Sequence, residues 1–483
     1  MSNYKITLTS YLIIFVSILF AIVTRVYNIN YDHLWFDEII SFWVADPSVS
    51  IEESFKRHWS TEAGPILYNL ILKIYFNIFG YDVNLGRYLS FILNILGIII
   101  TAFICLKIKK NNSFILCLVL LTSNIFLIIY SQELRAYSLI FFLSALYLYV
   151  FLEIIIKKTN TKKRVFFFTF FIFVQILMLL SHPFCLIIFF SSVLFSLIKF
   201  FKFNENLKEF NYSIIITLIF SFFYFSSYFK NSIIYPEWIV QPDLKFYTNF
   251  YFSKFFGSRL IGLVHLGILI GLIFNYFKKK EKEKDLFIIS LFLILLFLSY
   301  FLPILFGYLI KPIIFPRYII FVLIPIMIIL SILIYEIKNE FLKKLLIVIL
   351  VFGNIGNLYT ESIIQQFIKE RPNYKSDFSS ALKAIGKSEN KYYTIDIPSY
   401  NSQHEIAIGN YTKILAKNLN LKINFINKKN FIDSKKEEIW TICLIVITKD
   451  KCSKVHAVFD SNYLENRDFT NISLKKIKKL QTY

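Results

Sequence analysis

Ionisable side chains occur at a few places in an otherwise apolar sequence, each at or just beyond the end of an apolar segment. Charged groups near a membrane are costly, so they usually serve a function. Acids and bases gathered at one end of a helical bundle are typical of an active site, where a carboxylate can accept a proton from a reacting group. A pore would instead need polar residues at mid-depth, where these segments are almost purely apolar. The set comprises Arg25, Asp32, Asp37, Glu38, Glu62, Arg87, Glu133, Arg135, His182, Lys311 and Arg317.

Long apolar segments must position these residues. Apolar residues make up 56% of the 483 positions, and the mean hydropathy is +0.58. They come in blocks of about 20 residues, the length that a helix needs to cross a bilayer. The first block, Tyr11 to Tyr27, has no small-residue cleavage site after it, so we expect a signal anchor. We predict an α-helical polytopic membrane protein with about eleven transmembrane helices, at 9–27, 88–107, 113–130, 136–156, 165–181, 184–201, 211–229, 259–277, 285–302, 317–335 and 343–358.

The basic residues between these segments predict the orientation. Five loops, 107–112, 157–164, 199–210, 278–284 and 336–344, carry 19 Lys and Arg. The connections 131–135, 182–183, 230–258 and 303–316 carry 7 when Arg259 and Arg317 are included. Cytoplasmic loops are enriched in Lys and Arg, so the amino terminus is predicted inside and the carboxyl-terminal region outside. The richness in Lys, Ile, Asn and Phe favours a bacterial inner membrane.

Composition also argues against other classes of protein. The net charge of +21 would suit a nucleic-acid partner, but the basic residues lie mainly in turns between apolar blocks, so no nucleic acid is expected. Cys105, Cys117 and Cys185 fall inside apolar blocks and are expected to pack there, whereas Cys443 and Cys452 could form a disulfide if they lie outside the cytoplasm. The sequence has no glycine-rich phosphate loop, no CxxC and no HExxH.

Two regions depart from the pattern of simple hairpins. Residues 28–87 form a first outer loop with a helix from Pro65 to Phe79, whose Asn69, Lys73 and Asn77 make a narrow polar stripe typical of an amphipathic interfacial helix. Residues 359–483 are polar and alternate short apolar runs with helix-like stretches, namely Phe378–Lys387, Tyr392–Ile397, Ile406–Leu419, Ile423–Ile426 and Thr441–Thr448. They predict a small α/β domain outside the cytoplasm. The predicted division is therefore 1–358 for the bundle, with 28–87 as its loop, and 359–483 for the carboxyl-terminal domain.

An ordered series of motifs resembles the GT-C glycosyltransferases, most closely the branch with protein O-mannosyltransferases and the aminoarabinose transferase acting on lipid A. The motifs cover roughly the first three-quarters of the chain. They are Thr24-Arg25-Val26-Tyr27-Asn28, Leu34-Trp35-Phe36-Asp37-Glu38, Gly64-Pro65-Ile66-Leu67-Tyr68, Gly86-Arg87, Gln132-Glu133-Leu134-Arg135-Ala136-Tyr137-Ser138, Ser181-His182 and Pro316-Arg317-Tyr318. Relatives often have a histidine near the proline of the Gly64-Pro65 segment, where this chain has Glu62 instead.

The resemblance implies transfer of a sugar from a polyprenyl-phosphate carrier to an acceptor, with inversion, on the outer face of the membrane. It makes Asp37 the candidate catalytic carboxylate, with Glu38 beside it. The leaving phosphate needs cations, and arginine can bind phosphate bidentately; the candidates are Arg317, Arg135, Lys311, Arg87 and Arg25. Residues expected near the acceptor or lining the cavity are Glu62, Glu133, His182 and Tyr318.

Each assignment has a structural alternative. Asp37 could cap the helix that follows, Glu38 could be structural, and Arg25 and Arg87 could extend to the headgroups. Arg317 heads a helix, where its charge opposes the helix dipole and indicates an anionic partner.

The same holds for the residues in turns. Glu133 and Arg135 are too close in sequence to share a helix face, although a tight turn could point both into a cavity. His182 could be an ordinary turn residue, an acceptor contact or a metal ligand. Oxygen ligands from Asp37, Glu62 and Glu133 could also bind a divalent cation. The rival functions are a glycan ligase or polymerase using a diphosphate carrier, a lipid-linked saccharide transporter, and a non-catalytic partner.

Overall fold

The structure is a computed structural model that describes 7–62, 64–108, 111–156, 161–203, 210, 212–220, 222, 239–278, 287–360, 363–369, 375–397, 402–427, 430, 437–445 and 464–478. The chain forms two compact units. We call Met1–Tyr27 with Tyr88–Glu370 the helical unit, and Asn28–Arg87 with Arg371–Tyr483 the loop–sheet unit. This differs from the predicted division, in which residues 28–87 belonged to the bundle. The first loop instead folds with the carboxyl-terminal region, through long-range contacts that local sequence patterns do not reveal.

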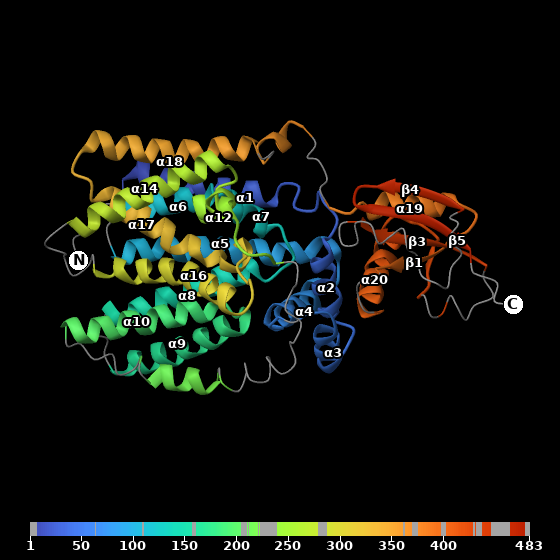
Figure 1. The fold of residues 1–483 in the computed structure, drawn as a ribbon, viewed down its shortest axis with the longest axis horizontal. Helices are drawn as coiled ribbons and strands as arrows, with labels where there is room; N and C mark the ends of the chain where they lie inside the picture. Colours follow the sequence, from blue (N-terminus) through green and yellow to red (C-terminus); the bar gives the residue numbers. More distant parts are fainter. Residues whose placement is uncertain are drawn as a thin grey trace. The chain divides into compact units, whose positions relative to one another are not determined.

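The helical unit is built from long apolar helices, several of which lie side by side with nearly parallel axes in Figure 1. Its elements are α1 (Leu8–Val26), α5 (Val83–Ile108, which begins in the loop–sheet unit), α6 (Asn111–Thr122), α7 (Ile125–Ser131), α8 (Tyr137–Ile156), α9 (Thr161–Ser181), α10 (Cys185–Phe203), α12 (Leu244–Asn249), α13 (Phe252–Phe255), α14 (Arg259–Lys278), α16 (Ile289–Leu309), the 3₁₀ helices η1 (Pro316–Val322) and η2 (Gln365–Phe367), α17 (Leu323–Tyr335) and α18 (Glu340–Thr360).

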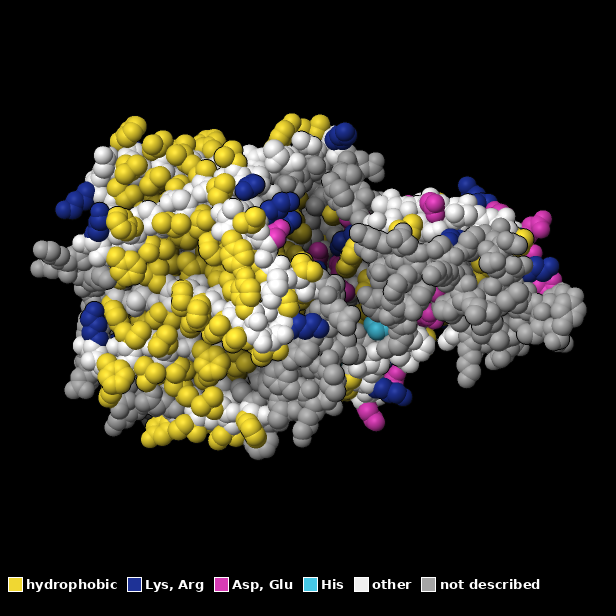
Figure 2. Space-filling view, viewed as in Figure 1, with side chains coloured by type: hydrophobic (Ala, Val, Ile, Leu, Met, Phe, Trp, Pro, Cys, Tyr) yellow, Lys and Arg dark blue, Asp and Glu magenta, His cyan; other side chains and the backbone are white. Residues whose placement is uncertain are grey.

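Within the described residues, eight helices are long and apolar enough to cross a membrane: α1, α5, α8, α10, α14, α16, η1 with α17, and α18. The pair α6 and α7, bent by 58°, would make a ninth if the two helices form one broken span. The predicted helix 165–181 lies within α9, which begins four residues earlier, while nearly half of 211–229 lies outside the described residues. The chain is a polytopic membrane protein, and hydrophobic side chains cover much of the visible surface of the helical unit in Figure 2.

The structure corrects the predicted helices at 113–130 and 285–302. The helix predicted at 113–130 breaks where Asn124 Oδ1 accepts a hydrogen bond from Leu127 N at 3.0 Å, which caps α7 and ends the preceding helix. The helix predicted to end at 302 continues through Pro303 to Leu309, because neighbouring helices can satisfy backbone groups that a proline leaves free in a membrane helix.

The loop–sheet unit contains the predicted α/β domain and three helices of the first loop. These helices are α2 (Phe36–Val44), α3 (Ile51–Thr61) and α4 (Leu67–Phe79). The carboxyl-terminal region adds α19 (Phe378–Lys387), β1 (Tyr392–Asp396), α20 (Ser402–Asn418), β2 (Asn424–Phe425), β3 (Glu438–Leu444), β4 (Glu465–Phe469) and β5 (Ile472–Lys478).

The sheet has the order β2-β1-β3-β5-β4. Strand β1 is parallel to β2 and β3, whereas β5 is antiparallel to β3 and β4. Helix α20 contacts β1 and β2, and α19 contacts β5. The predicted helix and strand runs before β3 are confirmed. Strand β3 contains the first part of the run predicted at Thr441–Thr448, of which 446–448 lie outside the described residues. Strands β4 and β5 were not predicted, because β4 is a mostly polar edge strand and β5 carries three lysines.

The cysteines follow the sequence prediction where the structure describes them. Cys105, Cys117 and Cys185 are buried free thiols. Cys443 is buried on β3, but Cys452 lies outside the described residues, so their pairing stays a prediction.

Candidate functional site

The two neighbouring carboxylates of the first loop have different environments. Both lie in the first turn of α2, where Asp37 is half-buried and Glu38 is 1% exposed. Glu38 Oε2 accepts a hydrogen bond from the backbone N of Trp35 at 2.8 Å. The capping role that the sequence left open for Asp37 therefore belongs to Glu38.

Glu38 holds a buried arginine that closes the loop. Nε of Arg87 lies 3.1 Å from Oε1 of Glu38, and one Nη lies 3.2 Å from Oε2. The remaining guanidinium N–H groups donate to the carbonyl oxygens of Ile29, Asp32 and His33 at 2.9–3.0 Å. Because five N–H donors meet protein acceptors, Arg87 has a role in the structure of the loop and does not extend to the headgroups.

Two cations determine the ionisation of Glu38. Nζ of Lys375, just before α19, lies 2.7 Å from Oε2 of Glu38. Burial opposes the charged form, but Arg87, Lys375 and their hydrogen bonds outweigh burial and hold the pKa of Glu38 well below its usual range. Glu38 is therefore ionised and enclosed by protein groups, so it is poorly placed to exchange a proton with a reactant.

Glu62 ends α3 beside a buried histidine. Nε2 of His58 lies 2.6 Å from the carbonyl oxygen of Gly64. Nδ1 of the same ring lies 3.2 Å from Asn69 Nδ2 and 3.7 Å from Glu62 Oε2. A histidine therefore contacts the Gly64-Pro65 segment. It belongs to the preceding helix and does not occupy the position near the proline where relatives often have a histidine.

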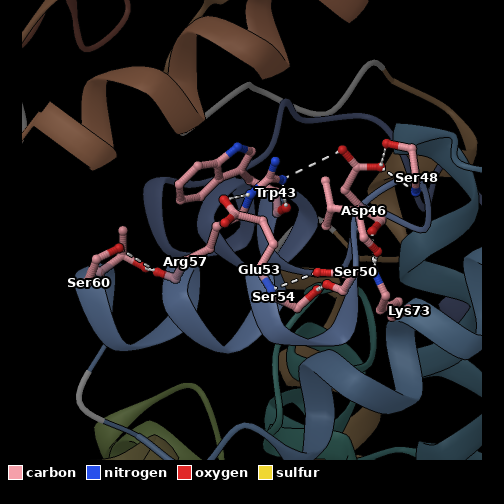
Figure 3. A network of polar contacts seen from close by, with 11 residues as sticks. Trp43, Asp46, Ser48, Ser50, Glu53, Ser54, Arg57, Ser60 and Lys73 are labelled. Atoms are coloured by element: carbon pink, nitrogen blue, oxygen red, sulfur yellow. Dashed lines mark hydrogen bonds and ion pairs between the residues drawn. The ribbon is translucent and has the colours of Figure 1, made fainter.

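A second polar network joins the end of α2 to α3 and α4 (Figure 3). The Arg57 guanidinium lies 4.7 Å from the Trp43 ring and 3.6 Å from an Asp46 carboxylate oxygen. It also pairs with Glu53 at 3.2 Å. Lys73 of α4 donates to the carbonyl oxygens of Asp46 and Val49. These contacts keep the three loop helices together and support the position of α2.

The helical unit gathers the other candidate residues around aromatic rings. Arg317, at the start of η1, lies 5.7 Å from the Tyr137 ring centre and 5.8 Å from that of Tyr318. The Tyr318 ring lies 5.2 Å from His182. Glu133, Arg317 and Tyr318 are all near enough to act electrostatically on the Tyr130 hydroxyl. The structure thus brings together Arg317, Tyr318, His182 and Glu133.

His182 is neutral in this group. Its Nδ1 accepts a hydrogen bond from the backbone N of Phe184 at 3.2 Å, so the proton of the neutral ring is on Nε2. Burial, together with the nearby Arg135 charge, lowers the pKa of His182 to about 3. The Nε2–H can therefore donate a hydrogen bond to a ligand, whereas a metal would need that nitrogen unprotonated.

Glu133 and Arg135 lie in the tight turn between α7 and α8, where Arg135 N donates to the Glu133 carbonyl oxygen at 2.9 Å. Arg135 acts electrostatically on His182, which places it with this group. Lys311 follows the end of α16 and is half-buried.

Arg25 is not part of the group. Its side chain is fully buried among α1, α5 and α6, so it does not extend to the headgroups. Its Nε donates to Asn94 Oδ1 at 3.0 Å, and its Nη atoms donate to the carbonyl oxygens of Thr122, Ala21 and Leu121 at 3.1–3.5 Å. This arginine ties three helices together.

Several residues of the two units were missed from the sequence. Lys375 and His404 lie outside the motifs quoted from the sequence, His58 is one turn before its expected place, and Tyr130 is an aromatic residue in an aromatic-rich chain. Tyr137 was within a quoted motif but was given no role. Only His58 had a usable signal, since a histidine four residues before a carboxylate shares its helix face.

No three His, Cys, Asp or Glu side chains are grouped to hold a metal ion in the part of the chain that the structure describes. The described residues therefore give no geometric support for a divalent cation bound by Asp37, Glu62 and Glu133.

Comparisons with known proteins identify the fold. No family model matches the sequence, and no curated protein matches it. Among solved structures, ArnT from Cupriavidus metallidurans bound to undecaprenyl phosphate matches 97% of this chain and 98% of its own, with a TM-score of 0.61 and 10% identity.

An archaeal oligosaccharyltransferase also matches. AglB from Archaeoglobus fulgidus, in complex with an inhibitory peptide and a dolichol-phosphate, aligns with 91% of this chain and 69% of its own, with a TM-score of 0.51 and 10% identity. Both proteins belong to the GT-C superfamily. The chain therefore shares its fold, the GT-C fold, with these two proteins.

Proposed function

We propose that this protein is a membrane glycosyltransferase that moves a sugar from a polyprenyl-phosphate carrier to an acceptor. The fold supports the class of reaction, because ArnT and AglB share it. The observation that carries the assignment of the site is the contrast within α2, where Glu38 is enclosed by cations and Asp37 is partly exposed. One carboxylate is committed to structure and the other can meet a substrate.

Asp37 acts as the general base in this proposal. The acceptor hydroxyl loses its proton to the Asp37 carboxylate as its oxygen attacks the anomeric carbon. The bond from that carbon to the phosphate oxygen breaks on the opposite side, and its electron pair leaves with the polyprenyl phosphate. Attack opposite the leaving group inverts the anomeric centre.

The leaving phosphate gains negative charge, and the basic group of the helical unit would stabilise it. Arg317 and Arg135 are the main candidates, and Lys311 is a secondary one. The neutral His182 would donate its Nε2–H to a phosphate or sugar oxygen, and Tyr318 would pack against the donor. Arg25 and Arg87 take no part in binding phosphate, because their guanidinium groups already donate to protein acceptors.

The bias of basic residues between the membrane helices supports an outer location for the reaction, with the amino terminus in the cytoplasm. A multi-pass protein of a bacterial inner membrane would meet its polyprenyl donor in the bilayer. The loop–sheet unit would then lie outside the cytoplasm.

Transfer of a whole glycan is the second candidate. The match to AglB, an oligosaccharyltransferase, favours it. Such a reaction would use the same attack on an anomeric carbon with a larger donor, so the identity of the donor separates the two candidates.

The test is release or transfer of sugar from a panel of radiolabelled polyprenyl-monophosphate and polyprenyl-diphosphate sugars in proteoliposomes. We expect activity with one monophosphate donor, and a loss of about 10²–10⁴-fold in kcat for Asp37→Asn. Glu52→Gln is the matched control, since Glu52 is an exposed carboxylate of the same loop.

Each other outcome has a defined meaning. Activity with diphosphate donors alone would favour glycan transfer. Full activity in Asp37→Asn would remove Asp37 from the mechanism. Inactivity of folded wild-type protein with every donor would argue against glycosyl transfer.

A further inference from the structure

The carboxyl-terminal domain has no role in the proposed chemistry, yet it contacts the segment that carries Asp37. Ala407 of α20 packs against Ile40, Trp43 and Val44 of α2 in one buried cluster. Both segments belong to the loop–sheet unit. The body of α2 thus rests on the carboxyl-terminal domain.

The residues just before α2 are held from the same side. Leu34 N donates to the Tyr411 hydroxyl of α20 at 3.3 Å. The backbone N of Lys375 lies 3.4 Å from Asp32 Oδ1. The backbone just before α2 is therefore held by Tyr411 and Lys375, which are more than 300 residues away in sequence.

Lys375 holds the residue that follows Asp37. Its Nζ lies 2.7 Å from Glu38 Oε2, the same oxygen that accepts from Trp35 N. The Lys375 side chain is 15% exposed and that of Glu38 is 1% exposed. A charge-assisted hydrogen bond between such enclosed groups is short and directional.

His404 holds the residue that precedes Asp37. Its ring stacks on Phe36 with 5.5 Å between ring centres and 12° between planes. Nε2 of His404 lies 3.2 Å from the carbonyl oxygen of Thr61, next to Glu62. Burial lowers the pKa of His404, although Thr61, Glu62 and Asp37 oppose the shift, and a neutral ring with hydrogen on Nε2 suits this hydrogen bond.

We propose that Lys375 and His404 are positioning residues for glycosyl transfer, acting through Glu38 and Phe36 to hold the Asp37 carboxylate in place. Asp37 is the second residue of a nine-residue helix, so the direction of its side chain depends on the first turn. A displacement of about 1 Å can lower the rate about 10²-fold. The carboxyl-terminal domain is then a functional part of the catalytic apparatus. This inference rests on the proposed function.

Kinetics of the full-length protein in proteoliposomes test the inference, with the donor that the panel identifies. We expect Lys375→Met to lower kcat about 10- to 100-fold, with little change in KM for the donor. Lys375→Arg should recover most of the activity because it restores the charge beside Glu38. His404→Phe keeps the stacking and loses the hydrogen bond to Thr61, so we expect a smaller fall in kcat.

Lys417→Met is the matched control, because Lys417 is exposed on the same helix as His404, and it should behave as wild type. A kcat near the wild-type value in both Lys375→Met and His404→Phe, with folded protein, would overturn the inference. Equal losses for Lys375→Met and Lys375→Arg would also overturn the role of the charge.

A measurement without substrate separates this inference from the proposed function. The rate at which a thiol reagent modifies Asp37→Cys directly reports the accessibility and orientation of the side chain at position 37. We expect Lys375→Met, but not Lys417→Met, to change that rate. An unchanged rate would overturn the positioning role even if glycosyl transfer is confirmed. A changed rate with no active donor would show that Lys375 positions residue 37 although the proposed function fails.

Discussion

Nε of Arg87 lies 3.1 Å from Oε1 of Glu38, and both side chains are at most 2% exposed. The pair joins the first helix of the loop to the beginning of α5, 49 residues later. Since Arg87 also binds three carbonyl oxygens from the entry of the loop, one side chain connects its start, its first helix and its end. The path of the loop depends on this contact.

Replacement of Arg87 by Met should therefore destabilise the protein. Breaking a buried ion pair costs about 3–5 kcal/mol, and the change also removes the donors to three loop carbonyl oxygens, although Lys375 still contacts Glu38. Thermal unfolding in detergent would show a lowered midpoint for Arg87→Met. The double variant Glu38→Gln with Arg87→Met should lose less than the two single variants together.

The control is Arg467→Met, which breaks an exposed pair with Glu465 on β4. Exposed pairs contribute about 0–1 kcal/mol, so this midpoint should hardly move. Equal midpoints for Arg87→Met and Arg467→Met would contradict the structural role of Arg87.

Sequence patterns predicted the segments better than their assembly. Periodicity and hydropathy predicted most membrane helices, α4, α19 and the first three strands, because each depends on local residues. They could not predict that α2 packs on α20, because nothing local marks Ala407 as the partner of Val44. The sequence therefore grouped the first loop with the bundle, whereas its contacts group it with the carboxyl-terminal region.

The candidate site shows the same limit. Asp37 and Glu38 were both recognised as acids, but their different environments come from Arg87 and Lys375, which are distant in sequence. Arg25 and Arg87 carried the charge expected of a phosphate ligand, yet their donors are used by carbonyl oxygens that only the folded chain brings near. Residue type identified the chemistry, while tertiary contacts decided which residues are available for it.

Arg317 should matter for donor binding. Hydrogen bonds to charged groups contribute about 1.5–3 kcal/mol, so Arg317→Met should weaken binding of polyprenyl phosphate by about 10- to 100-fold. Equilibrium binding to the solubilised protein would measure this. Arg259→Met is a suitable control, since Arg259 is an exposed arginine at the start of another helix.

Arg25→Met provides the contrasting result. Because Arg25 ties α1 to α5 and α6, it should lower the unfolding midpoint and leave the affinity of the remaining folded protein unchanged. Weak binding in Arg25→Met, together with normal binding in Arg317→Met, would reverse the assignment of the two arginines.

His182 should make stability depend on pH. The unfolded chain binds a proton at this histidine below about pH 6.5, whereas the folded pKa is lowered to about 3. Between these values the unfolded state binds more protons, so stability falls as pH falls through this window. His182→Asn should lose less stability than wild type between pH 7 and pH 4, measured by thermal unfolding. Parallel curves for the two proteins would show that His182 has the same pKa in the folded and unfolded states, which would contradict the prediction.

The last prediction is that the apolar face of α4 enters the membrane interface. The polar stripe seen in the sequence points partly into the loop, because Asn69 contacts His58 and Lys73 binds two carbonyl oxygens. The exposed side instead carries Ile74, Ile78 and Phe79, each more than 60% exposed. Both ends of the loop continue into membrane helices, α1 and α5, and an apolar helix face held near a bilayer enters its interface.

A spin label at Ile78→Cys should therefore be more accessible to oxygen, which concentrates in lipid, than to a water-soluble nickel complex. A label at Glu52→Cys on α3, an exposed polar position of the same loop, should show the opposite preference. If the two labels behave alike in liposomes, the apolar face of α4 meets water or protein and the interfacial assignment is wrong. If only the label at position 78 prefers oxygen, the face opposite the polar stripe is the one that enters the lipid, which the sequence pattern alone could not decide.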